Sequence, residues 1–278
     1  MDADPLLDRP HGEVDRTASP GLAAVSRRDR VIIWTCLAAL IGLSWAYLVF
    51  LDRQMAASMA YDSMMAEMGM AMDRSWTGAD VFFTFVMWDV MMVGMMAGSA
   101  APVLLLFGKA RAGRGGPAVS RAVLTFGLGY VTVWTAFSAC AALVQWALHE
   151  AALMSPGMSV ANPRVAGAIL VAAGVYQLTP VKGACLAHCQ SPLGFLMSHW
   201  REGNWGAFQM GIRHGAYCLG CCWALMGVLF AVGVMNLFWV AALAVFVLLE
   251  KIGPAGPLVA RTSAVLLIAF GLFVFVGS

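Results

Sequence analysis

The feature that most constrains this chain is a series of long apolar stretches separated by short polar connections. A helix of about 20 apolar residues crosses a hydrocarbon core of roughly 30 Å, and a shorter one can re-enter it. The sequence therefore predicts an all-α fold, a polytopic transmembrane helical bundle in a lipid bilayer, with about seven transmembrane helices. The stretches are residues 31–51, 81–107, 121–148, 165–181, 210–232, 235–250 and 260–277, of which the fourth and sixth are the shortest.

Composition supports a membrane protein and gives no support for several other classes. Only 12% of the residues are charged, and the formal net charge is +2, whereas soluble domains carry about 25% charged residues. A charge this small does not indicate a nucleic-acid partner. No phosphate-binding, dinucleotide-binding, HExxH or nucleophile-elbow pattern is found, and there are only five histidines for acid–base work. We therefore expect a protein that is not an enzyme.

Lysine and arginine positions predict the orientation, because cytoplasmic connections retain an excess of them. The first 30 residues have no apolar run and no cleavage site, which indicates a disordered cytoplasmic tail rather than a signal peptide. With that tail inside, fourteen basic residues lie on the cytoplasmic side, and Arg53, Arg74 and Arg164 lie outside. We expect a multi-pass protein of a bacterial cytoplasmic (inner) membrane, with residues 31–278 as a transmembrane metal-binding domain.

Methionine is unusually frequent, with 19 residues, and it clusters in the outer connection at 52–80. Thioethers bind copper(I) without the thiols that an oxidising compartment would convert to disulfides. We expect this methionine-rich outer loop to capture metal, although its Ala, Met and Glu content also allows an amphipathic surface helix. The candidate ligands are Met64, Met65, Met68, Met70 and Met72.

The fifth apolar stretch carries a stripe of soft ligands at helical spacing. Its members follow each other by four, four and three residues, which places them on one helix face with a further cysteine beside it. They are Met210, His214, Cys218 and Cys221, with Cys222 adjacent. Thiolate, thioether and imidazole together favour a copper(I) ion, with zinc as the alternative. Buried cysteines acting only as small apolar side chains are the structural alternative.

A second group of donors, Cys185, His188 and Cys189, follows the fourth stretch, and its thiols are one helical turn apart. In the predicted topology both groups meet at the cytoplasmic face, so Cys185, Cys189, Cys218 and Cys221 could converge on one ion. Paired thiols also suit a thiol-redox function, which is the main rival interpretation.

The second apolar stretch places Asp89, Met92 and Met96 on one helix face. A carboxylate inside a bilayer is costly and therefore suggests a functional role. The alternative is that Asp89 hydrogen-bonds a neighbouring helix and that the methionines are ordinary packing residues.

Three segments resemble a known family: Tyr176–Lys182, Cys185–Pro192 and Ala216–Met226, the last reading AYCLGCCWALM. They are similar to the DUF2182 family of integral membrane proteins, in which metal binding is inferred and some members are labelled copper chaperones. The resemblance covers about residues 80–278 and includes Trp88–Pro102 and Glu250-Lys251. It implies metal binding more firmly than any pathway.

Together these patterns predict copper(I) handling. The metal would be collected by the outer methionines, passed along the second stretch and held by the cysteine and histidine cluster. Delivery to a copper-dependent membrane enzyme, exchange with a periplasmic copper carrier, transport and storage all fit this scheme. The alternatives are a thiol-redox protein and a structural subunit in which zinc joins the fourth and fifth stretches.

Overall fold

The structure is a computed structural model that describes residues 27–68, 76–113, 119–155, 158–253 and 255–277. These residues form helices, and their one β-type pairing is an isolated bridge between Met154 and Val160. The helices are α1 (Arg27–Glu67), α2 (Gly78–Gly113), α3 (Val119–Glu150), α4 (Pro163–Gln177), α5 (Pro180–Gln190), α6 (Pro192–His199), α7 (Gly203–Gly227), α8 (Leu229–Val232), α9 (Leu237–Ile252) and α10 (Gly256–Val276). The all-α prediction is confirmed.

Each apolar stretch of the sequence corresponds to a helix, but not all the helices are long. Among the described residues, five helical segments are long and apolar enough to cross a membrane: α1, α2, α3, α7 with α8, and α10. Helices α4 and α5 meet at an angle of 63° and count as a sixth if they form one bent span. The sixth apolar stretch is α9, which has only 16 residues. Seven complete crossings therefore remain a prediction.

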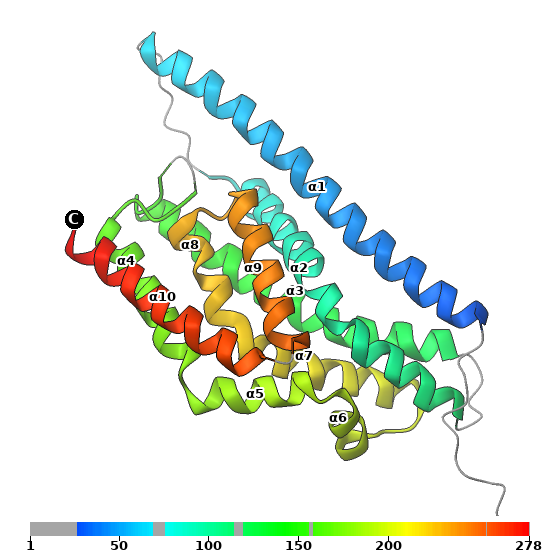
Figure 1. Cartoon of the computed structure of the whole chain (residues 1–278). Helices are drawn as coiled ribbons and strands as arrows, with labels where there is room; N and C mark the ends of the chain where they lie inside the picture. Colours follow the sequence, from blue (N-terminus) through cyan, green and yellow to red (C-terminus); the bar gives the residue numbers. More distant parts are fainter. Residues whose placement is uncertain (1–26, 69–75, 114–118, 156–157, 254, 278) are drawn as a thin grey trace, which may run out of the picture.

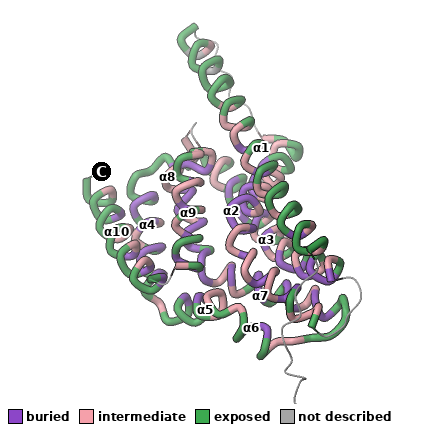
Figure 2. The backbone as a smooth tube through the Cα atoms, turned by 45° about the vertical axis from the view of Figure 1, so that its right-hand side comes forward, coloured by how far each residue is buried: buried purple, intermediate pink, exposed green. Residues whose placement is uncertain are grey.

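The helices pack into a bundle with α2, α3 and α7 at its centre, where the buried residues concentrate (Figure 2). Helix α1 packs along α2, and α3 lies between α2 and α7. Helices α4 and α10 form a close pair at the side, and α9 contacts both α2 and α10. Helix α5 bends across the end of the bundle and packs on α7 (Figure 1).

The contact between α3 and α7 depends on glycine. A side chain at Gly129 would overlap the backbone carbonyl of Phe208, and one at Gly211 would overlap the carbonyl of Phe126. Without a Cβ on either side, the two backbones can approach closely enough to touch. This contact brings Tyr130 on α3 next to the cysteine stripe of α7.

The two ends of the bundle differ in charge. Helices α5 and α6, the start of α1 and the end of α9 lie at one end (Figure 1). Most of the described lysines and arginines belong to helix ends on that side, whereas Arg53, in the second half of α1, and Arg164, at the start of α4, do not. Helix α1 continues to Glu67, so residues 52–67 of the expected outer loop are helical, and the end of α1 extends beyond the bundle (Figure 1).

Candidate metal centre

Helix α7 places all five predicted ligands of its stripe inside the bundle. Met210, Cys218, Cys221 and Cys222 are at most 1% exposed and His214 is 3% exposed. Small residues on this helix, including Gly211 and Gly215, let α3 pack against the same face. The residues that share this spacing are therefore buried together on α7, and their role as metal ligands stays a prediction.

The thiols of α7 cluster around one turn of the helix. The Cys221 and Cys222 thiols donate hydrogen bonds to the Cys218 carbonyl, at 3.1 Å and 2.9 Å. The Cys189 side chain, from α5, interacts with both Cys218 and Cys221. All seven cysteines of the chain are free. The structure thus brings three of the four cysteines that we expected to converge into contact, together with Cys222.

The fourth of those cysteines and its histidine neighbour lie at the edge of the cluster. The Cys185 sulfur packs against Gly220 on α7, in a position that a larger residue would block. His188 stacks on Tyr217, with ring centroids 4.2 Å apart, and its Nδ1 is 2.9 Å from the Ala184 carbonyl. His188 therefore contacts α7 by stacking its ring on Tyr217 and not by contacting a cysteine sulfur.

A lysine that the site prediction did not include lies among the sulfurs. Lys251, at the end of α9, is 6% exposed, and its Nζ donates to Cys218 Sγ at 2.8 Å. The same nitrogen is 3.8 Å from Cys222 Sγ and 4.0 Å from Met96 Sδ. An ammonium group from α9 thus occupies the space between two thiols of α7 and a thioether of α2.

Tyr130 on α3 is the other unpredicted member of the site. Its hydroxyl is 2.9 Å from Cys218 Sγ and donates to the Met96 carbonyl at 3.3 Å. The methionine face of α2 and the cysteine stripe of α7, which we treated as separate in the sequence, therefore meet at Met96 and Cys218.

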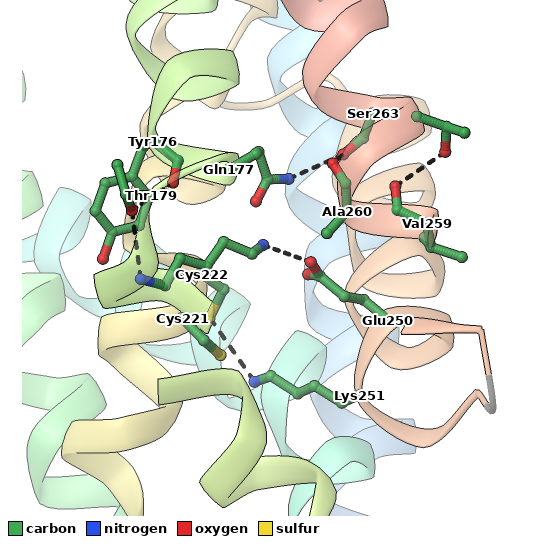
Figure 3. Close-up of polar contacts among 12 residues, drawn as sticks. Tyr176, Gln177, Thr179, Cys221, Cys222, Glu250, Lys251, Val259, Ala260 and Ser263 are labelled. Carbon is green, nitrogen blue, oxygen red and sulfur yellow. Dashed lines mark hydrogen bonds and ion pairs between the residues drawn. The ribbon is translucent and has the colours of Figure 1, made fainter. Parts of the chain in front are cut away.

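A buried ion pair lies beside the thiols. Lys182 of α5 and Glu250 of α9 are 2.5 Å apart, with side chains 1% and 0% exposed. Figure 3 shows Glu250 and Lys251 extending from the end of α9 toward the α4–α5 and α7 side. The adjacent charges Glu250-Lys251 at the end of an apolar stretch were the sequence signal for this network. Only the tertiary structure shows that Glu250 pairs with Lys182 and that Lys251 contacts Cys218.

His214 lies one turn from Cys218 in an aromatic pocket. The rings of Phe126, Tyr130 and Phe195 have centroids between 5.1 Å and 6.1 Å from its own. Its Nδ1 is buried and has no hydrogen-bond partner within the described part of the chain. Met210, one turn further away, accepts a hydrogen bond from the Arg201 backbone at 3.3 Å. His214 is therefore the available nitrogen ligand, while the Met210 sulfur is engaged.

Among the remaining candidates on α2, Met92 and Met96 are buried, whereas Asp89 is partly exposed. Both methionines are 0% exposed, and the preceding Met91 and Met95 are 1% and 4% exposed. The Asp89 carboxylate has one buried oxygen with no partner in the residues that the structure describes. Nearby, Trp88 donates to Gln145 at 2.7 Å, and Gln145 donates to the Met158 sulfur at 3.4 Å. One oxygen of Asp89 thus has no partner among the described residues, and a functional role for this carboxylate stays a prediction.

Three of the predicted outer methionines, Met64, Met65 and Met68, lie at the end of α1, and Met64 and Met68 are about half exposed. Met70 and Met72 lie outside the described residues. None of the three described methionines lies at the cysteine site.

The chemistry of the cluster suits a soft monovalent metal better than a hard one. Its donors are sulfurs and one imidazole, which match copper(I). No group of three or more His, Cys, Asp or Glu side chains within the described ranges is arranged as a ready-made metal site. The sulfurs are gathered, but Lys251 rather than a fourth ligand fills the space between them.

The fold is a helical bundle with apolar segments long enough to span a membrane, which is consistent with a membrane protein, and it encloses a buried cluster of sulfurs. Residues 85–274 match the model of the PpoB2 family, which is described as copper chaperone. The match covers more than half of the sequence, so the chain belongs to this family. Comparisons with curated proteins and with solved structures gave no match.

Proposed function

We propose that this protein binds copper(I) within the membrane at the α7 cysteine cluster and passes it to a recipient rather than catalysing a reaction. The observation that carries the proposal is the convergence of Cys218, Cys221 and Cys222 with Cys189 and Met96 in a buried site. Sulfur donors from separate helices can change their grouping when a helix shifts. Such a site can release copper as well as bind it.

The charges of the bundle support an orientation for this transfer. The cysteine cluster lies toward the end that carries most of the lysines and arginines, which the positive-inside rule assigns to the cytoplasm. The buried methionines of α2, including Met87, Met91 and Met95, run from the opposite end toward Met96. We propose that copper moves along this row between a periplasmic source or recipient and the thiols. The recipient would be a copper-dependent membrane enzyme or a periplasmic carrier.

Metal content of the purified full chain tests the proposal. Wild-type protein and the Cys218→Ser/Cys221→Ser variant are expressed with added copper, purified under reducing conditions and measured by mass spectrometry. We expect about one copper per wild-type chain and loss of most of it in the variant, because thiolates supply the strongest soft ligands. Cys140→Ser, which changes an exposed thiol on α3, is the matched control and should retain copper.

Two results would contradict the proposal. Copper at the same level in the double variant would place the metal elsewhere. Zinc in the wild-type chain, with a melting temperature that falls when a chelator is added, would favour the structural zinc interpretation instead.

A further inference from the structure

A second group of sulfurs surrounds a cavity at the opposite end of the bundle from the cysteine cluster. The cavity has a volume of about 450 Å³ and lies between α1 and the turn that joins α8 to α9. Three thioethers, a carboxylate and an amide line it, together with Ala56, Leu237 and Phe238. The polar and sulfur-bearing residues are Asp52, Met55, Met59, Met235 and Asn236.

The α1 side of the cavity is one helix face. Asp52, Met55 and Met59 are spaced by three and four residues, so they lie one above another along the helix. Asp52 and Met55 are partly buried, whereas Met59 is 42% exposed at the rim. Helix α1 thus presents a graded row of ligands, from the surface into the cavity.

The opposite wall is held in place by its own backbone. Gly233 has a positive φ of 101°, which allows the chain to turn sharply between α8 and α9. The Val234 amide donates to the Met158 carbonyl at 3.2 Å, and the Asn236 side chain accepts from Trp239 at 3.4 Å to cap α9. Met235 therefore faces α1 from a restrained position.

Within the described ranges, no lysine, arginine or histidine forms an ion pair with the carboxylate in this cavity. Asp52 has no hydrogen-bond or ion-pair partner among the described side chains. Its charge attracts a cation, and the thioethers around it select a soft one. Thioethers bind without losing a proton and cannot form disulfides, so the site suits an oxidising compartment.

From these observations we propose that Met55, Met59 and Met235, with Asp52, form a surface site for copper(I) that is separate from the cysteine cluster. The two sites lie near opposite ends of α9. Leu237 lines the cavity and Lys251 lies in the cysteine cluster, and a helix rises about 21 Å over these 14 residues. This inference rests on the proposed function in that it assigns the point where copper enters or leaves.

The inference also changes which methionines matter. The sequence pattern directed attention to Met64, Met65 and Met68, which lie further along α1 and do not line the cavity. Met55 and Met59 are closer to the bundle, and Met235 comes from a turn that no sequence motif connects with them.

The first test uses a full-length variant, purified in detergent, from which the cysteine cluster has been removed. The substitutions are Cys189→Ala, Cys218→Ala, Cys221→Ala and Cys222→Ala. Copper(I) affinity is measured by competition with a chromophoric chelator in the presence of a reductant. We expect one bound copper(I), and an affinity about tenfold or more weaker after Met55→Leu/Met59→Leu/Met235→Leu, because three of the sulfur ligands are lost. Leucine conserves the volume of methionine, so the fold should tolerate the change.

The matched control is Met64→Leu/Met65→Leu/Met68→Leu, which changes three thioethers on the same helix outside the cavity. It should leave the affinity unchanged. No copper binding in the quadruple cysteine variant, or equal affinity with and without the cavity methionines, would overturn the inference. If wild-type protein binds copper and the cysteine substitutions abolish that binding, the cysteine site is still supported. Failure of the cavity site can therefore be distinguished from failure of the proposed function.

A second measurement keeps the native cysteines in case the quadruple cysteine variant does not fold. Wild-type protein with isotope-labelled methionine methyl groups is titrated with silver(I), a diamagnetic substitute for copper(I), and is followed by NMR. After the first equivalent fills the thiols, the second should shift the methyl signals of Met55, Met59 and Met235. Shifts confined to Met64, Met65 and Met68, or no further shifts, would overturn the inference.

Discussion

At the scale of single residues, Lys251 distinguishes this site from a set of ligands on one helix. Its ammonium group is buried beside Cys218, Cys222 and Met96, where an isolated charge would be costly. A copper(I) ion held by two thiolates carries a net negative charge. The lysine therefore supplies the opposite charge that such a complex needs away from water.

Lys251→Met should accordingly weaken copper(I) binding. We expect a loss of about tenfold or more, because removing one member of a buried charge pair leaves the other uncompensated. Lys251→Arg keeps the charge and should retain more of the affinity than Lys251→Met. Chelator competition on purified protein measures all three forms.

Lys109→Met is the control for this experiment, since it removes the same charge from an exposed position on α2 and should bind copper normally. Tighter binding by Lys251→Met than by wild type would show instead that the ammonium competes with the metal for the sulfurs.

At the scale of helices, the site depends on how closely α3 and α7 approach. The crossing at Gly129 and Gly211 brings their backbones into contact. Tyr130 follows Gly129 directly, and its hydroxyl reaches Cys218. A wider separation of the two helices would break this hydrogen bond as well as the packing.

Gly129→Ala should therefore destabilise the protein, by about 1–3 kcal/mol for an overpacked contact. The added methyl group would overlap the Phe208 carbonyl, which belongs to a helix backbone and cannot rotate away. A lower midpoint of thermal unfolding in detergent, measured by circular dichroism, is the expected result.

Gly127→Ala provides the comparison on the same helix, because nothing lies within 4 Å of an added Cβ there. Alanine favours helix over glycine, so this variant should be as stable as wild type or more stable. Equal stability of the two variants would mean that the close crossing does not limit packing.

At the scale of the whole molecule, the bundle separates two kinds of sulfur chemistry. The thiols lie toward the basic end with α5 and α6, and the thioethers of the α1 cavity lie toward the other. Helix α10 runs from the first end to the second and ends at Val276 (Figure 1). If the basic end faces the cytoplasm, the C-terminus lies in the periplasm.

Fusions at the C-terminus test this orientation. Alkaline phosphatase joined after residue 278 should be active in cells, because it folds in an oxidising compartment, and green fluorescent protein at the same position should be dark. The reverse pattern would place the thiols on the outer side and would contradict the proposed direction of the methionine row.

The sequence by itself determined the class of fold and part of the site. Apolar stretches of membrane-spanning length have few stable solutions other than helices, because backbone groups in lipid must be hydrogen-bonded internally. The spacing from Met210 to Cys221 likewise required no tertiary information, because it follows from the helical repeat alone.

Only the tertiary structure decided which distant residues complete the two sites. Lys251 and Tyr130 reach Cys218 from 33 and 88 residues away, and Met235 faces Met55 across the cavity. No local periodicity in the sequence predicts these contacts between distant residues. They depend on how closely the helices pack and on where α4 and α9 end. The thioethers that line the cavity were therefore not the ones that the sequence pattern singled out.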